Sequence, residues 1–145
     1  MTGAGRLLGV DWGETRIGLA VSDEGQTIAQ PLATLTRRPG KRVPMTKLID
    51  LARANDVTGV IVGLPLDEHG EEGEPARAAR ELAATLAKRM GMPVNLWDER
   101  FTTARARRAV QEMGGSTRGR KEDIDALAAA LLLQHYMDAQ RGSAT

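Results

Sequence analysis

The stretch LLGVDWGETRIGLAVSD, residues 7–23, decides how the fold begins. It holds two strand-like apolar runs, 6–12 and 16–22, separated by a short turn that contains glycine, which is the pattern of a β-hairpin. A third strand is expected over residues 27–35. Pro31 would place that strand at an edge or a bend of the sheet, because proline cannot donate to a hydrogen-bonded ladder. The chain is therefore predicted to open with an antiparallel meander.

Beyond the meander, the hydrophobic pattern changes to that of alternating helices and strands. The uninterrupted apolar run VTGVIVGL, residues 57–64, suits a strand that is buried on both faces. Strands and helices that alternate after a meander imply a five-stranded mixed sheet with helices on both faces, an α/β fold. We expect residues 1–145 to form a single domain, with about 142–145 as a disordered tail. The other predicted elements are helices over 44–54, 75–90, 102–113 and 121–140 and a strand over 93–97.

Composition narrows the class of protein. A hydrophobic fraction of 41% in 145 residues allows one real core, whereas 3% aromatic residues disfavours a single-strand binder built on stacked rings. The formal net charge of +1 means that any surface for nucleic acid must be local. Cysteine is absent, which excludes disulfides, thiolate metal sites and cysteine nucleophiles. With no signal-peptide pattern and no membrane-length apolar run, a cytoplasmic protein is expected.

Acidic residues stand where predicted strands end. Asp11 closes the first strand and Asp98 and Glu99 follow the fifth, so they could meet at the carboxyl edge of the sheet, the usual ligand site of such folds. Asp125, near the start of the last helix, could reach the same edge. Each acid alone has a simpler interpretation, as a turn residue, as a partner of Arg100 or as an acid favoured at a helix N-terminus.

Taken together, these acids point to a site for divalent metal ions. Clustered carboxylates repel each other, and a bound cation removes that cost. Oxygen donors without Cys or His favour Mg²⁺ or Mn²⁺ over Zn²⁺. Two such ions, about 4 Å apart, can activate a water and stabilise the leaving oxygen of a phosphodiester. The set therefore predicts a metal-dependent nuclease.

The opening stretch resembles the first motif of the YqgF (RuvX) family, which is similar in fold to ribonuclease H and to RuvC-type Holliday junction resolvases. The resemblance covers nearly the whole chain, in order. It continues through AQPL (29–32), VIVGLPLDEHGEEG (60–73), LWDERFTT (96–103) and KEDIDALAAALLLQHYMD (121–138). It implies an RNase H-like fold and a nuclease linked to maturation of the 5′ end of pre-16S rRNA, in ribosome biogenesis, or by analogy to the resolution of DNA junctions.

The resemblance also implies which residues act. Asp11, Glu99 and Asp125 would be the catalytic residues and would hold the metal, with Asp98 as a further ligand. One departure concerns the run that ends in Gly63-Leu64-Pro65, because ribonuclease H-like enzymes carry an acid near that point. Glu99, from the next strand, must then take the place of that acid.

Basic residues that could hold a nucleic acid are concentrated late in the chain. Between residues 105 and 121 the sequence contains six Lys and Arg residues and one acidic residue. Arg118, Arg120 and Lys121 fall in a glycine-rich stretch beside the predicted site, where we expect contacts with phosphates that weaken as salt rises. Arg16 lies close to Asp11 through the hairpin and could clamp a phosphate. Arg100 is a weaker candidate for the same role.

Two other classes of protein share parts of this pattern. A non-catalytic nucleic-acid binder would keep the fold but would have no need of the three acids. An actin-like ATPase shares the segment Gly9-Val10-Asp11-Trp12-Gly13 but closes two such lobes around a nucleotide, and 145 residues provide one lobe. The residues alone leave open RNA or DNA as substrate, whereas the family resemblance favours ribosomal RNA. The sequence also leaves open a monomer or a homodimer, although a junction resolvase would need two sites and hence a dimer.

Overall fold

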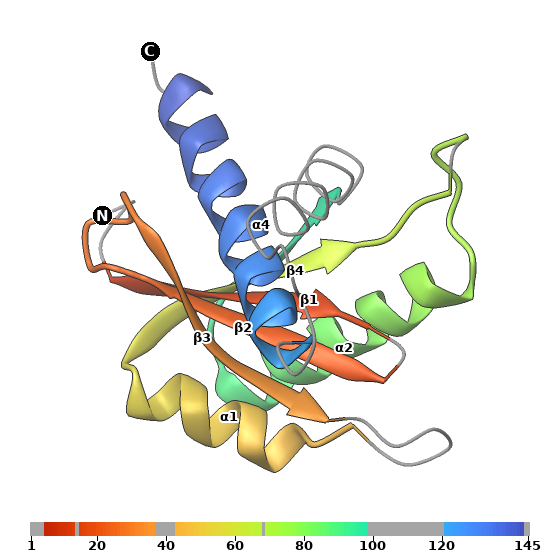
Figure 1. The fold of residues 1–145 in the computed structure, drawn as a ribbon, viewed down its shortest axis with the longest axis horizontal. Helices are drawn as coiled ribbons and strands as arrows, with labels where there is room; N and C mark the ends of the chain where they lie inside the picture. The colour runs from red at the N-terminus through yellow and green to blue at the C-terminus, as the bar shows by residue number, and fades with distance from the viewer. Residues whose placement is uncertain (1–4, 14, 37–42, 68, 99–120, 144–145) are drawn as a thin grey trace.

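The sheet of the computed structural model has the mixed topology that the sequence predicts. The structure describes residues 5–13, 15–36, 43–67, 69–98 and 121–143. Strands run in the order β3-β2-β1-β4-β5, antiparallel between β1, β2 and β3 and parallel between β1, β4 and β5 (Figure 1). The elements are β1 (Arg6–Trp12), β2 (Arg16–Ser22), β3 (Ala29–Thr36), α1 (Met45–Ala54), β4 (Val57–Leu64), α2 (Glu74–Met90), β5 (Val94–Asp98) and α4 (Lys121–Ser143).

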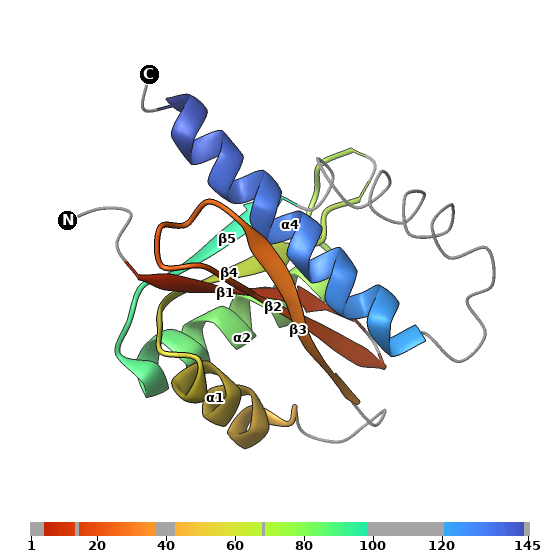
Figure 2. The same ribbon diagram turned by 60° about the vertical axis from the view of Figure 1, so that its left-hand side comes forward.

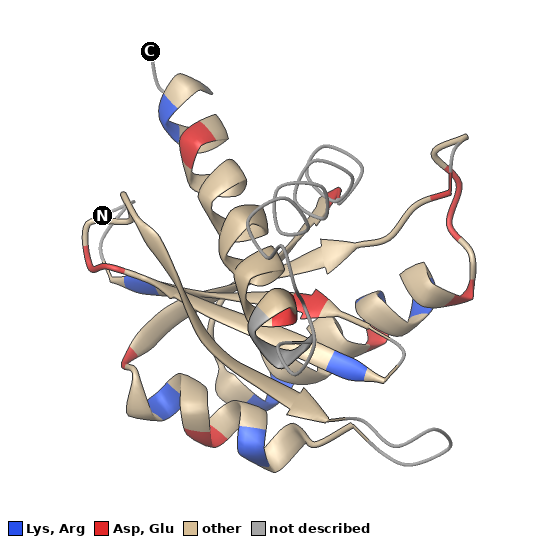
Figure 3. Cartoon of the chain, viewed as in Figure 1, with Lys and Arg blue, Asp and Glu red and all other residues tan. Residues whose placement is uncertain are grey.

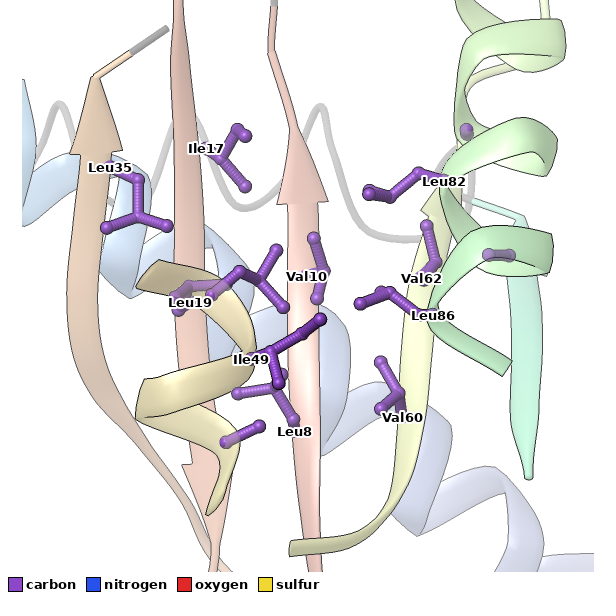
Figure 4. Close-up of a cluster of buried hydrophobic side chains, with 14 of the residues drawn as sticks. Leu8, Val10, Ile17, Leu19, Leu35, Ile49, Val60, Val62, Leu82 and Leu86 are labelled. Carbon is purple, nitrogen blue, oxygen red and sulfur yellow. The ribbon is translucent and has the colours of Figure 1, made fainter. Parts of the chain in front are cut away.

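Helices cover both faces of this sheet, as predicted. Helices α1 and α2 lie on one face and α4 lies on the other (Figure 2). Alternate residues of each strand point to opposite faces, so β1 gives Leu8 and Val10 to the α1/α2 side and Leu7 to the α4 side. The larger cluster of buried side chains, on the α1/α2 side, is built from Leu, Ile and Val of four strands and both helices (Figure 4).

The edge strand β3 differs from the prediction at its start. It begins at Ala29 rather than at residue 27, because the Asp23 carboxylate accepts hydrogen bonds from the backbone N–H groups of Thr27 and Ile28 at 2.7 and 3.0 Å. These N–H groups serve the turn and not the ladder. Pro31 lies in the edge strand, which confirms its predicted place, and the register with β2 shifts beside it.

The hydrogen bonds of the turn around Asp23 should make the thermal stability of the protein depend on pH in the acidic range. Hydrogen bonds lower the pKa of Asp23 from 3.8 to about 2, first among them the bond from the Ile28 backbone. Because the folded pKa is depressed, this contribution is complete above pH 4 or so and is lost as the pH falls toward 2. We expect Asp23→Asn to lower the Tm at pH 5 and to flatten the fall of Tm between pH 4 and 2, as measured by circular dichroism.

A neighbouring variant serves as the control for that measurement. Glu24→Gln removes a carboxylate from the same exposed turn, and its side chain takes no part in these hydrogen bonds. Its Tm profile is expected to follow that of the wild type. An Asp23→Asn profile as steep as that of the wild type would contradict the role assigned to the Asp23 carboxylate.

Helix α4 extends further than the sequence indicates. It continues to Ser143, so residues 142 and 143 are helical although they were expected in a disordered tail that starts at about 142. Its last turns are tied down: Arg141 pairs with Asp138 and donates to the backbone carbonyl of Gln26. These contacts give the end of the helix partners that a free tail would lack.

A glutamine in the middle of α4 joins this helix to the edge strand. The Gln134 side-chain oxygen accepts from the backbone N–H of Ala29 at 2.9 Å, and its nitrogen donates to the carbonyl of Thr27 at 2.8 Å. The amide thus satisfies two backbone groups at the point where β3 begins, groups that would otherwise need water. It fixes α4 against the β2–β3 turn.

Candidate active site

Helix α4 approaches the sheet closely because two glycines lie beneath it. A Cβ atom at Gly18 of β2 would overlap the backbone carbonyl oxygen of Asp125, and a Cβ atom at Gly9 of β1 would lie 2.9 Å from that of Leu133. Larger residues at these positions would hold the helix away from the strands. The close approach therefore determines where the first turns of α4 meet the sheet.

The same contact brings two predicted site carboxylates to one place. Asp11 pairs with Gly18 in the β1–β2 ladder. Directly opposite residues of an antiparallel ladder have Cα atoms about 5 Å apart and side chains on the same face. Since Asp125 rests on Gly18, Asp11 and Asp125 share the α4 side of the sheet at the carboxyl end of β1. Figure 3 shows acidic residues at the end of β1 and in the first turns of α4.

Arg16 contributes the positive charge at this point. Its Nε donates to Oδ2 of Asp125 at 2.5 Å, and the two side chains are 35% and 27% exposed. Alternation along β2 puts Arg16 on the same face as Gly18, beneath the start of α4. The pairing with Asp125 was not foreseen from the sequence, and a phosphate contact by Arg16 stays a prediction.

Asp98 belongs to the other side of the sheet. In β5, Trp97 packs with the α4 cluster, whereas Leu96 packs against the α1/α2 cluster. Alternation then directs the side chain of Asp98 to the α1/α2 side, away from Asp11 and Asp125. Asp98 as a metal ligand stays a prediction, which this alternation disfavours.

Several predicted site residues cannot be placed. Glu99, Arg100, Arg118 and Arg120 lie outside the described residues, as does the helix predicted over 102–113. Lys121 is described only as the first residue of α4. The roles of all five side chains therefore stay predictions.

A tryptophan joins β5 to α4 beside the site. Trp97 pairs with Gly63 in the β4–β5 ladder. Its indole Nε1 donates to Nδ1 of His135 at 3.0 Å, and its ring meets that of Tyr136 edge-on at 5.3 Å between centroids. The indole thus connects the strand that precedes Glu99 to the helix that carries Asp125.

The loop after β4 gives this edge of the sheet an acidic rim (Figure 3). Leu66 and Glu72 form an isolated bridge, and the Asp67 carboxylate accepts from two backbone N–H groups of the loop at 2.8 Å each. Arg80 of α2 holds Glu72 through two bonds of 2.5 and 2.7 Å, and the hydrogen bond from Arg80 lowers the pKa of Glu72. These contacts place negative charge at this edge of the sheet.

The carboxylate oxygens of the candidate site are the kind of ligand that a hard divalent cation prefers, and the described residues supply two of these carboxylates. Asp11 and Asp125 are both partly buried carboxylates. Oxygen donors of this kind favour Mg²⁺ or Mn²⁺. Within the described ranges, no group of three or more His, Cys, Asp or Glu side chains could hold a metal ion. The predicted third ligand, Glu99, falls outside those ranges.

The arrangement of strands and helices has counterparts among solved structures. The RuvC protein of Thermus thermophilus, solved in complex with a Holliday junction, superposes with a TM-score of 0.59 at 19% identity, over 96% of this chain and 97% of RuvC. At that identity the likeness concerns the fold. It makes this an α/β protein of the RNase H-like class, which confirms the predicted fold.

Sequence comparison gives the family. The family model of RuvX, described as a Holliday junction resolvase, matches residues 5–139, and the chain belongs to the RuvX family. Proteins of Koribacter versatilis and Myxococcus xanthus are each 42% identical to it, over 92% and 94% of this chain and 87% and 89% of their own length. Both carry the provisional name pre-16S rRNA nuclease. No helix in the described ranges has the length and apolar character needed to cross a membrane.

Proposed function

We propose that this chain is a divalent-metal-dependent phosphodiester nuclease that processes the 5′ end of pre-16S rRNA. The observation that carries the proposal is the placement of Asp11 opposite Gly18, on which the start of α4 sets Asp125. Two carboxylates held at the carboxyl end of a central strand suit metal-assisted hydrolysis. The names of the relatives in Koribacter and Myxococcus support pre-16S rRNA as the substrate. Such a role places the protein in the cytoplasm.

The proposed chemistry assigns a part to each acid. Asp11, Glu99 and Asp125 would hold two Mg²⁺ or Mn²⁺ ions. Ions of this kind, when bound, supply an activated water and a counter-charge for the leaving oxygen. The role of the protein would be to hold its carboxylates in place before the metal binds. Asp11 lies in the β1–β2 ladder, and Asp125 lies on a helix in close contact with that ladder. Such rigid placement avoids reorganisation during the reaction.

The proposed contacts with the nucleic acid are electrostatic. Arg100, Arg118, Arg120 and Lys121 would bind phosphates beside the carboxylates, so affinity should fall as the salt concentration rises. The acidic loop after β4, which carries Asp67 and Glu72, would repel the phosphate backbone of the nucleic acid and so keep it away from that part of the site.

A DNA junction is the second candidate substrate. It is favoured by the description of the matching family as a Holliday junction resolvase. A resolvase must cut two strands, so this alternative requires a homodimer with two sites, whereas trimming of a single RNA strand would need only a monomer. The mass of the protein in solution therefore bears on the choice.

A cleavage panel tests the proposed function. Purified protein is incubated with a 5′ precursor fragment of 16S rRNA, an unstructured RNA of equal length and a four-way DNA junction, each with Mg²⁺, Mn²⁺ or EDTA. We expect the precursor to be cut only when metal is present, and the junction to be cut at least tenfold more slowly. Preferential cutting of the junction by a dimer would favour the resolvase, and no cleavage under any condition would favour a non-catalytic binder.

A further inference from the structure

Among the residues that the structure describes, the ion pair with Asp125 uses only one of the donor nitrogens of the Arg16 guanidinium. Among the described residues, this pair is the one polar contact of the Arg16 side chain, and it uses Nε. A guanidinium carries five N–H donors, four of them on the terminal nitrogens Nη1 and Nη2. The side chain is 35% exposed, so a ligand in solution can reach part of it.

Within the described part of the chain, the pair also leaves one carboxylate oxygen of Asp125 without a hydrogen bond. The contact is to Oδ2, and Oδ1 has no other hydrogen bond within the described ranges. A carboxylate held through one oxygen is oriented for a ligand at the other, which is how outer partners commonly orient metal-binding carboxylates. Arg16 is anchored as the first residue of β2, where the neighbouring pair of the ladder joins Trp12 to Ile17. Both partners are thus fixed by the sheet and by the helix in contact with it.

We propose that Arg16 has two roles at once: its Nε orients Asp125, and its terminal nitrogens bind a phosphate oxygen beside the carboxylates. The guanidinium is planar and rigid, so one anchored edge fixes the direction of the other donors. Arg16 would then be a positioning residue for Asp125 that also links this acid to the nucleic-acid backbone. The inference rests on the proposed function, because it takes the ligands to be a divalent cation and a phosphodiester.

Two neutral variants of equal length separate the two roles. In Arg16→Gln, the side-chain nitrogen stands where Nε stood and can still donate to Oδ2. In Arg16→Met, a methyl group takes that position and cannot donate. Both lose the charge and the terminal donors, so a difference between them isolates the orienting bond. Ion pairs that keep contact with solvent add little to stability and this pair is partly exposed, so both variants should fold, which circular dichroism checks.

The first readout is Mn²⁺ binding, measured without substrate by calorimetry or electron paramagnetic resonance. We expect Arg16→Met to bind Mn²⁺ about tenfold more weakly than Arg16→Gln, as is usual when an outer partner of a metal ligand is lost. Equal affinities would overturn the orienting role. Tighter binding by Arg16→Met than by Arg16→Gln would mean that the bond competes with the cation, and would overturn it as well.

The second readout is binding of the rRNA precursor in Ca²⁺, which keeps cleavage out of the measurement. One lost phosphate contact should lower the slope of log affinity against log salt by about one unit. We expect this change in Arg16→Gln, with the slope restored in Arg16→Lys because that variant keeps the charge. A slope that does not change in Arg16→Gln would overturn the phosphate contact.

These readouts keep the two proposals apart. If the wild type binds Mn²⁺ and RNA but cleaves nothing, the nuclease proposal fails while the roles of Arg16 are still decided by the variants. If the wild type cleaves RNA and the variants bind like it, the nuclease proposal stands and the inference about Arg16 fails. A wild type that binds neither Mn²⁺ nor RNA would overturn both.

Discussion

Asp11→Asn is expected to abolish metal-dependent cleavage of the rRNA precursor while the protein keeps its fold. Asparagine has nearly the same shape as aspartate, so the β1–β2 pairing around Asp11 and Gly18 should persist. The change removes the charge that a hard cation needs and with it several kcal/mol of stabilisation of the transition state. A loss of about 4 kcal/mol corresponds to a rate about a thousandfold lower. The measurement is single-turnover cleavage in Mn²⁺, with circular dichroism to check the fold.

Two further variants make that result specific. Asp50→Asn changes an exposed acid of α1, on the other side of the sheet, and should cleave like the wild type. Asp98→Asn tests whether Asp98 is a metal ligand, which its position in β5 disfavours. A loss of cleavage rate as large as that of Asp11→Asn would show that Asp98 takes part in the metal site. Near-normal cleavage by Asp11→Asn would remove Asp11 from the mechanism, and the proposed site with it.

Gly18→Ala should be the most damaging small substitution in the sheet. The added methyl would overlap the backbone carbonyl of Asp125, and a helix backbone cannot rotate aside as a side chain can. Overpacking of this kind costs about 3 kcal/mol, or roughly 10 °C in Tm for a domain of this size. If α4 moves outward by about 1 Å to make room, cleavage should fall about a hundredfold, because displacements of that size disturb catalytic geometry. Thermal melts and single-turnover rates measure both effects.

Gly142, near the end of helix α4, provides the matched control for Gly18→Ala. A Cβ atom at Gly142 meets nothing within 4 Å, so Gly142→Ala should leave the rate unchanged and keep or slightly raise the Tm. Wild-type stability and rate in Gly18→Ala would contradict the close contact between α4 and β2 on which the site is built.

Elements with a strong local signal could be predicted from the sequence. The ranges of β1, β2 and β4 agree with the apolar runs, because each strand contains at least four consecutive buried residues, which give a strong local signal. The start of β3 could not be predicted, since it depends on a hydrogen bond between Asp23 and a residue four positions later. The end of α4 depends on contacts with the β2–β3 turn, which are distant in sequence.

The candidate site was predictable in part for the same reason. Asp11 was evident as a charge at the end of an apolar run, but the pairing of Arg16 with Asp125 joins residues 109 positions apart and leaves no local trace. One signal was available and was missed. In β2 the small residues Gly18 and Ala20 alternate with large apolar ones, which is typical of a strand with a helix pressed against one face.

Helix α4 links Asp125, near its N-terminal end, to the β2–β3 turn. Gln134 lies nine residues further along, about 14 Å up the axis at 1.5 Å per residue, and it fastens the helix to the start of β3. Because a helix of this kind is stiff, a small tilt at that fastening becomes a displacement of the carboxylate. Changes in the β2–β3 turn that weaken these two hydrogen bonds are therefore expected to shift Asp125, and to affect both the stability and the proposed reaction.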